Sequence, residues 1–177
     1  MHCITQNEII DSILISYKED LGRYFEQYRN HVFRVYNLAI PFMSDNKDIE
    51  IISIASAFHD LGIWTNNTFD YIKPSIDLAK QFCISNNFDA SEIIEIETII
   101  ENHHKLSKVK TSKLAEILRQ ADLIDLTLGL IRKGRESKYI RVLKKTFPNK
   151  GFHLFLSWIF LKNLLKNPFK PLPMYKF

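Results

Sequence analysis

Apolar residues recur at intervals of three and four along almost the whole chain, and this spacing constrains the fold more than any other feature of the sequence. Such intervals place apolar side chains on one face of an α-helix. Hairpin signals are nearly absent, because the 177 residues include only five glycines and six prolines and no Asn-Gly or Asp-Gly pair. The sequence therefore predicts an all-α protein, a single compact helical domain of about seven to eight helices.

The expected helices cover most of the chain. Their ranges are residues 6–17, 21–41, 48–61, 74–86, 90–105, 111–131, 136–146 and 151–166. Gly62 is expected to end the third helix in a left-handed conformation, and residues 64–68 are expected to form a loop. The tail over residues 167–177, which contains three prolines, is expected to be extended.

Composition and the chain start indicate a folded protein in a reducing compartment. Cys3 and Cys83 form neither a disulfide framework nor a Cys-x-x-Cys metal site, and the first residues lack the apolar segment of a signal peptide. The longest apolar-rich stretch, residues 152–165, is shorter than the roughly 20 residues that a transmembrane helix needs. We therefore expect a cytoplasmic protein without a transmembrane segment.

The net charge of +4 conceals an asymmetry between the two parts of the chain. Residues 1–131 contain 12 basic and 19 acidic residues, a net charge of −7, whereas residues 132–177 contain 12 basic residues and one acid, a net charge of +11. The basic part is either a solvated surface or a contact for an anionic partner. No nucleic-acid partner is expected, since RNA-binding and zinc-finger signatures are absent. Helix 151–166 is apolar nearly all round, which indicates core or a contact surface such as a homodimer interface.

Histidines and aspartates lie on the expected inward faces of four helices. They are His31, His59 with Asp60, the pair His103 and His104, and Asp122 with Asp125. Taken singly, each has an ordinary interpretation: a buried histidine in the core, a histidine at a helix C-terminus, or an aspartate paired with a nearby arginine. Together they indicate a cation site, because a buried carboxylate is costly unless it is paired or bound to a metal. Imidazole and carboxylate without thiolate suit Mn, Fe, Co, Ni, Zn or Mg.

The chain resembles the HD-domain superfamily of metal-dependent phosphohydrolases, which has the pattern H…HD…D on an all-helical core. The matching segments are NHVFRVYNLA with His31, IASAFHDLG with His59-Asp60, and RQADLIDLT with Asp122. The resemblance implies that His31, His59, Asp60 and Asp122 bind the metal. It also implies an HD-like core over about residues 21–131, followed by a basic helical extension over residues 135–177.

The resemblance also bears on the number of metal ions. The segment ENHHK, with His103 and His104, is similar to adjacent histidines that bind a second metal in some members. Known two-metal members usually supply further histidines between the HD pair and the final aspartate, and this chain has none between His59 and His103. We therefore expect one divalent metal ion per chain, with His103 or His104 acting nearby.

The function implied by the resemblance is hydrolysis of a nucleotide or other small phosphoester by metal-activated water. Asp60, His103 and His104 are the expected catalytic groups, together with Asp125, which periodicity places even further inward than Asp122 and which we expect to orient a ligand. The expected substrate-binding residues are Arg34, Lys73, Lys105 and Arg132 for the anionic substrate and Trp64 for a base.

Two alternatives remain open at this stage. Some relatives of this superfamily use a di-iron site for oxygenation, which would require His103 and His104 as additional ligands. The third possibility is a metal-stabilised binding or regulatory module without catalysis. Helix 151–166 and the basic tail would then be its interaction surface.

Overall fold

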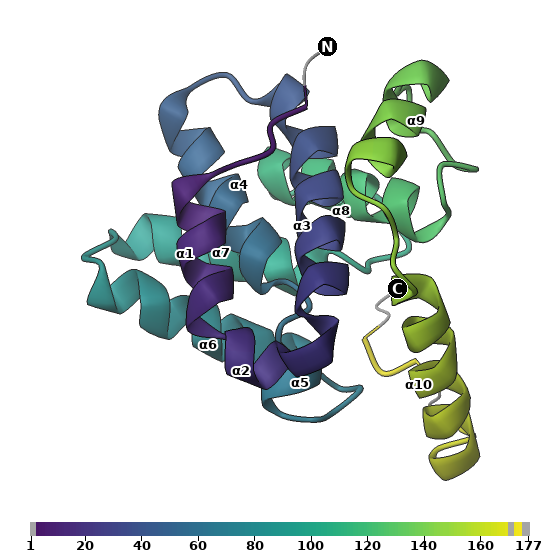
Figure 1. The fold of residues 1–177 in the computed structure, drawn as a ribbon. Coiled ribbons are helices and arrows are strands. Elements are labelled where there is room, and N and C mark those ends of the chain that lie inside the picture. Colours follow the sequence, from purple (N-terminus) through teal and green to yellow (C-terminus); the bar gives the residue numbers. More distant parts are fainter. Residues whose placement is uncertain (1–2, 170–171, 175–177) are drawn as a thin grey trace.

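The computed structural model describes residues 3–169 and 172–174, and within these ranges the chain forms helices and connecting segments without strands (Figure 1). Eight helices have nine residues or more: α1 (Glu8–Ser16), α3 (Phe25–Ala39), α4 (Asn46–Phe58), α6 (Ile72–Ser85), α7 (Ala90–Asn102), α8 (Lys113–Leu126), α9 (Ser137–Thr146) and α10 (Phe152–Lys166). Two four-residue helices, α2 (Lys18–Leu21) and α5 (Gly62–Thr65), and two 3-10 turns, Gly22–Tyr24 and Ile40–Phe42, complete the secondary structure of this part. The predicted all-α fold is confirmed.

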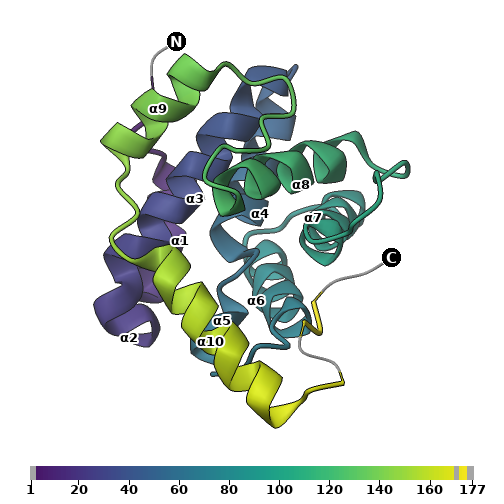
Figure 2. The same ribbon diagram turned by 90° about the vertical axis from the view of Figure 1, so that its right-hand side faces the viewer.

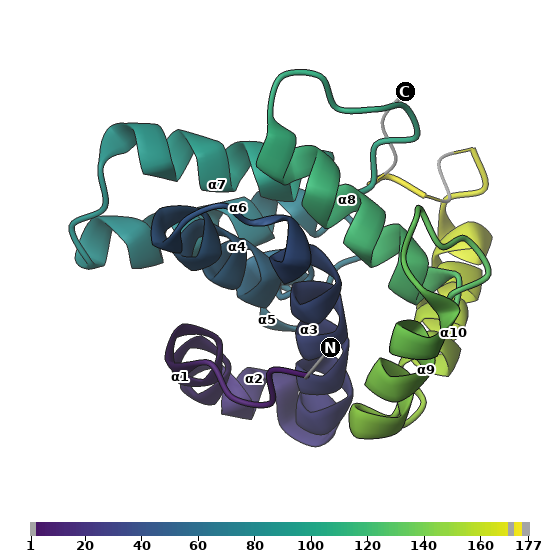
Figure 3. The same cartoon turned by 90° about the horizontal axis from the view of Figure 1, so that it is seen from above.

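Helices α3 and α4 lie at the centre of the molecule. Helix α3 packs against α4 and α8, while α4 also contacts α1, α6 and α7. Most of α3 is buried, so both polar and apolar side chains of this helix face other helices. Helices α9 and α10 lie on the side of the molecule opposite to the α6–α7 turn (Figures 1 and 3). No helix in the described part of the chain is long and apolar enough to cross a bilayer.

Polar side chains define where several helices begin. Asn7, Asp45 and Ser112 each accept a hydrogen bond from the N–H three residues later, at the starts of α1, α4 and α8. At the start of α7, Asp89 and Glu92 form a reciprocal capping box. These caps satisfy free N–H groups at the helix N-termini. They explain why the observed starts of these helices lie close to the starts predicted from the sequence.

Helix ends were less predictable. The helix expected over residues 111–131 ends at Leu126, because Leu128 and Gly129 adopt positive φ angles of 54° and 80°. The N–H of Gly129 donates to the carbonyl of Ile124 at 2.8 Å, which closes the helix. The expected helix 21–41 is α3 flanked by two 3-10 turns. Of the expected extended tail, residues 170–171 and 175–177 lie outside the described residues.

The prediction for Gly62 was wrong, and the loop expected over residues 64–68 is confirmed only at residues 66–68. Gly62 begins α5 and does not adopt a positive φ angle, and Trp64 and Thr65 belong to the same short helix. Glycine is needed here because α6 comes very close. A Cβ atom on residue 62 would lie 2.5 Å from the Tyr71 carbonyl oxygen and 2.9 Å from Pro74 Cβ.

We expect Gly62→Ala to reduce the free energy of unfolding by about 2 kcal/mol, because overpacking forces the backbone of α6 to shift. Gly134→Ala is the matched control, since residue 134 has a positive φ of 82° but open space around it. The control should lose about 1 kcal/mol. Urea-induced unfolding measures both values. A loss at Gly62 no larger than at Gly134 would contradict the close-approach explanation.

Candidate metal centre

Six His and Asp side chains from four segments meet in the interior and form what we call the His–Asp cluster. The members are His31 on α3, His59 and Asp60 directly after α4, His103 and His104 directly after α7, and Asp122 on α8. Each is at most 9% exposed. All six were predicted as site residues from the sequence. Helix α7 ends at Asn102, three residues earlier than expected, and this end turns both following histidines inward.

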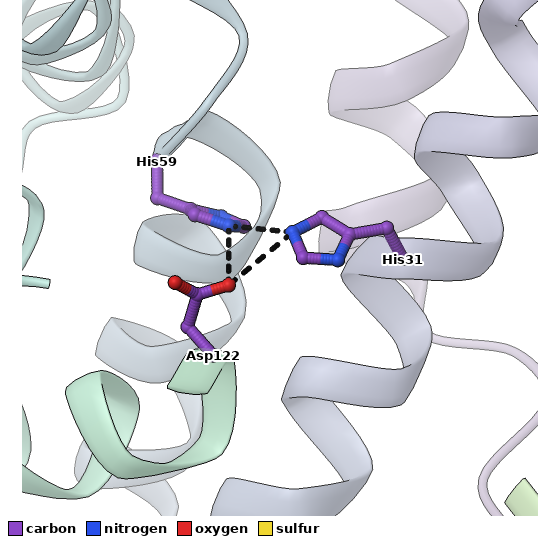
Figure 4. Close-up of side chains that lie close together, drawn as sticks. All are labelled: His31, His59 and Asp122. Atoms are coloured by element: carbon purple, nitrogen blue, oxygen red, sulfur yellow. Dashed lines mark hydrogen bonds and ion pairs between the residues drawn. The ribbon is translucent and has the colours of Figure 1, made fainter. Parts of the chain in front are cut away.

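The cluster contains two groups of three potential ligand atoms. One group is formed by His31, His59 and Asp122 (Figure 4), the other by Asp60, His103 and His104. Within each group the ligand atoms lie within 4.8 Å of one another. This differs from the single four-residue set expected from the sequence.

Asp60 lies between the two groups. Its Oδ2 atom is 3.5 Å from Nε2 of His31 and 3.5 Å from Nε2 of His59, while its Oδ1 atom is 3.3 Å from Nε2 of His103. One carboxylate therefore faces both groups, with one oxygen toward each.

Every histidine of the cluster has one ring nitrogen held by a hydrogen bond. The partners are Asp125 Oδ2 for His31 Nδ1 at 2.7 Å, the Ser56 carbonyl for His59 Nδ1 at 2.8 Å, the Ile100 carbonyl for His103 Nδ1 at 2.6 Å, and the Tyr71 hydroxyl for His104 Nε2 at 2.6 Å. These contacts fix the ring orientations. The other nitrogen of each ring faces the cluster, which is the arrangement of metal-binding histidines.

The Nε2 atoms of His31 and His59 are only 2.9 Å apart (Figure 4). Since Nδ1 of His59 donates to a carbonyl and Nδ1 of His31 donates to a carboxylate, a neutral tautomer of each ring presents a lone pair at Nε2. Two lone pairs at this distance repel each other. A proton or another cation is therefore required between the rings.

Asp125 holds His31 from behind and is itself held by Arg34. Nε and Nη2 of Arg34 donate to the two oxygens of Asp125 at 2.6 and 2.9 Å, and Nη1 donates to the Phe147 carbonyl at 2.9 Å. Burial alone would raise the pKa of the Asp125 carboxyl, but the hydrogen bond from His31 and the charge of Arg34 keep it well below its usual range. Asp125 is thus a buried anion that orients His31, and its two oxygens are held by Arg34 and His31.

The two facing histidines have opposite pKa shifts. Burial alone would lower the pKa of His31, but hydrogen bonds with Asp125 and Asp60 outweigh burial and raise it to about 9. Burial lowers the pKa of His59 to about 3, against the opposing charge of Asp60. Near neutral pH, the proton between the rings is therefore carried by His31.

The carboxylates of the cluster are also strongly perturbed. Burial raises the pKa of Asp122 to about 7, although the neighbouring His31 opposes this shift. Burial would also raise the pKa of Asp60, but His59, His103 and His31 hold it well below the usual range. Without a cation in the cluster, these buried groups must share protons to limit the cost of their charges.

Several buried atoms of the cluster make no hydrogen bond with the described residues. They are Oδ1 of Asp60, Nε2 of His103 and both carboxylate oxygens of Asp122. Buried polar atoms without partners are rare in folded proteins. Their convergence, together with the imidazole and carboxylate donor set, fits a divalent transition metal.

A cavity of about 230 Å³ reaches the cluster from the surface. Asp60, His104 and Ser157 contribute polar groups to its wall; the other lining residues are Phe69, Tyr71, Leu126, Leu156, Phe160, Leu172 and Met174. The cavity is therefore mainly apolar, and none of the described residues that line it is a lysine or arginine.

The five residues expected to bind substrate do not line this cavity. Arg34 is buried against Asp125, and Trp64 lines a separate groove of about 610 Å³ between α5 and α10. Lys73 is exposed and pairs with Asp77 on its own helix. Lys105 is half-buried, with its carbonyl accepting from Arg119, and Arg132 is exposed beyond the end of α8.

The sequence that forms this fold and site can be compared with known protein families. A family model described as HD domain matches residues 28–127. The chain belongs to the HD-domain family. This family consists mostly of metal-dependent hydrolases, and the HD-domain match contains all six residues of the His–Asp cluster and Asp125. No curated protein and no solved structure matches the chain.

Two tyrosines of the HD-domain site were not recognised as such from the sequence. Tyr71 contacts His104 through its hydroxyl, and the hydroxyl of Tyr28 donates to the Ala57 carbonyl at 2.9 Å beside the HD pair. Tyr28 lies three residues before His31 on α3, so helical spacing places both on one face, but spacing does not identify the hydrogen-bond partner of Tyr28. Tyr71 precedes α6 in a connecting segment, where periodicity carries no signal.

We expect binding of Mn²⁺ to release about one to two protons at pH 7, because His31 and part of the Asp122 population must lose a proton before they can bind metal. The apparent affinity should rise from pH 6 to about pH 9, where the raised pKa of His31 is passed. Calorimetry in buffers of different ionisation enthalpy counts the protons. Metal binding without proton release at pH 7 would contradict this assignment.

Proposed function

We propose that the protein is a metal-dependent phosphohydrolase that acts on a small phosphoester. The observation that carries this proposal is the convergence of Nε2 of His103 with carboxylate oxygens of Asp60 and Asp122, which make no hydrogen bond with the described residues, beside a cavity that Asp60 lines. Membership of the HD-domain family supports the same reaction class.

The two groups of the cluster favour two metal ions per chain over the single ion expected from the sequence. His31, His59 and Asp122 would hold one ion, His103 and His104 the other, and Asp60 would contact both through its two oxygens. When bound, such ions lower the pKa of a coordinated water and polarise a phosphoryl oxygen.

The chain's own residues orient the site and move protons. Asp125 keeps His31 in one orientation, and Arg34 keeps Asp125 ionised. With Nδ1 of His104 facing the cluster, the Nε2–H of His104 donates to the Tyr71 hydroxyl oxygen at 2.6 Å on the cavity wall, so the Tyr71 O–H is placed to deliver its proton to the departing alkoxide.

The cavity favours a small substrate with an apolar group. Its volume of about 230 Å³ is below the ~300–1,000 Å³ of typical ligand pockets. Its walls consist mainly of aromatic and aliphatic side chains. None of the described residues that line it is a lysine or arginine that could bind an extended polyphosphate. Among the phosphoesters expected from the sequence, a compact monoester or diester therefore fits better than a nucleoside triphosphate.

Hydrolysis of p-nitrophenyl phosphate and bis(p-nitrophenyl) phosphate by Mn²⁺- or Co²⁺-loaded protein tests the proposal. We expect Asp60→Asn to lower kcat/KM at least about a hundredfold, because this carboxylate faces both groups of the cluster. Release of p-nitrophenolate measures the rate.

Asp77→Asn is the matched control, since Asp77 is an exposed carboxylate that pairs only with Lys73 among the described residues. Its activity should equal that of the unaltered protein. Full activity of the Asp60→Asn protein with either substrate would refute the hydrolase assignment.

A di-iron oxygenase is the second candidate, and the inward nitrogens of both His103 and His104 favour it. The apolar cavity is also compatible with an uncharged substrate. We expect elemental analysis to distinguish the two functions: two irons per chain together with dioxygen consumption would support the oxygenase. Phosphoester cleavage by the Mn²⁺ protein without dioxygen consumption would exclude it.

A further inference from the structure

The outward face of α10 is apolar and exposed. The side chains concerned are Leu154, Trp158, Leu161 and Leu165, which are 78%, 56%, 55% and 86% exposed. At about 100° per residue, these four positions lie within an arc of about 60° around the helix axis. They form one continuous row, which we call the outer stripe. Exposed apolar surfaces of this kind mark interaction sites.

The opposite face of α10 attaches the helix to the domain. Phe152 is buried and stacks on His31 with ring centroids 4.3 Å apart, and Phe155 stacks on Trp64 at 5.5 Å. The described end of the tail also lies on this inner side, where Met174 is buried in a cluster with Tyr71. The leucines of the outer stripe are thus largely uncovered by the described residues, while Trp158 also lines the groove between α5 and α10.

Positive charge flanks the outer stripe. Lys162 is exposed at one edge of the stripe, with Nζ 5.0 Å from the centre of the Trp158 ring. Lys166 is exposed one turn later and lines the groove between α5 and α10 together with Lys162. Helix α10 contains no acidic residue. Helix α9, on the same side of the molecule (Figure 2), adds exposed basic side chains at Lys138, Arg141, Lys144 and Lys145.

We propose that the outer stripe docks on an anionic lipid surface, with α10 lying in the plane of the interface. Leucine side chains would enter the acyl boundary, Trp158 would lie at the headgroup level, and the lysines would reach phosphate and carboxylate headgroups. The concentration of basic residues on this side complements an anionic membrane. This proposal does not depend on the hydrolase activity.

Charge also argues against a homodimer interface, one of the uses of this helix that the sequence left open. Pairing two copies through the outer stripe would bring Lys162 and Lys166 of each copy close to a second basic helix that has no acidic residue to pair with them. Like charges at such an interface are unfavourable. An anionic lipid surface provides the missing negative charge.

Co-sedimentation with vesicles tests the proposal on the full chain. One set of vesicles contains phosphatidylcholine alone, and the other contains phosphatidylcholine and phosphatidylserine. We expect binding to the phosphatidylserine vesicles that weakens with added salt, together with a blue shift of tryptophan fluorescence.

The triple variant Leu154→Ser, Leu161→Ser, Leu165→Ser should lower the partition coefficient at least about tenfold, because it removes most of the apolar area of the stripe. The matched control is Ile15→Ser with Ile94→Ser, which changes two residues of similar exposure, 64% and 62%, on α1 and α7. The control should bind as the unaltered protein does. Circular dichroism and the thermal midpoint check that both variants fold.

Lys162→Gln with Lys166→Gln tests the charge contribution separately. It should weaken binding to phosphatidylserine vesicles and abolish much of the salt dependence while leaving the fold unchanged. Two results would overturn the proposal: absence of binding to both kinds of vesicle, or a dimer in sedimentation equilibrium that the triple leucine variant dissociates.

Discussion

The approach of two buried imidazole nitrogens to 2.9 Å is the constraint on which the rest of the structure depends. The Ser56 carbonyl and Asp125 each hold the far nitrogen of one ring, so neither His59 nor His31 can turn its lone pair away. A positive charge must therefore lie between them. The neighbouring carboxylates of Asp60 and Asp122 add negative charge to the same volume. The helices around this point hold these histidines and carboxylates close together, and a bound cation would balance their repulsion and negative charge.

The basic C-terminal part is joined physically to this centre. Arg34, which keeps Asp125 in place, also donates to the Phe147 carbonyl, and Asn30 donates to the Pro148 carbonyl at 2.7 Å. Both acceptors lie in the segment between α9 and α10. Helix α10 then provides Leu156 and Phe160 to the wall of the cavity. The extension expected to follow the HD-like core within the single domain therefore forms part of the cavity wall, with lipid contact proposed for its other face.

Sequence patterns predicted the helices and the inward histidines and aspartates well, because a period of three to four residues determines which face a side chain occupies. They did not predict which residues these side chains contact in the folded chain. Arg34 was expected to bind phosphate, yet its position one turn after His31 brings it to Asp125, 91 residues away in the sequence. Trp64 was expected near the substrate and instead stacks on Phe155, because α5 continues through a segment expected to be a loop. Because α10 is apolar nearly all round, its sequence could not indicate which side is exposed. The exposed side depends on which residues Phe152 and Phe155 contact in the folded chain.

The hydrogen bond between His31 and Asp125 spans 94 residues, and the cluster takes donors from four separate segments. Such a site cannot assemble in a partly folded chain, so a captured cation would stabilise only the complete fold. In a cell, a shortage of the cation would then act on the amount of protein as well as on the proposed activity. Chains with uncompensated buried charges would open more often and be degraded by proteases sooner.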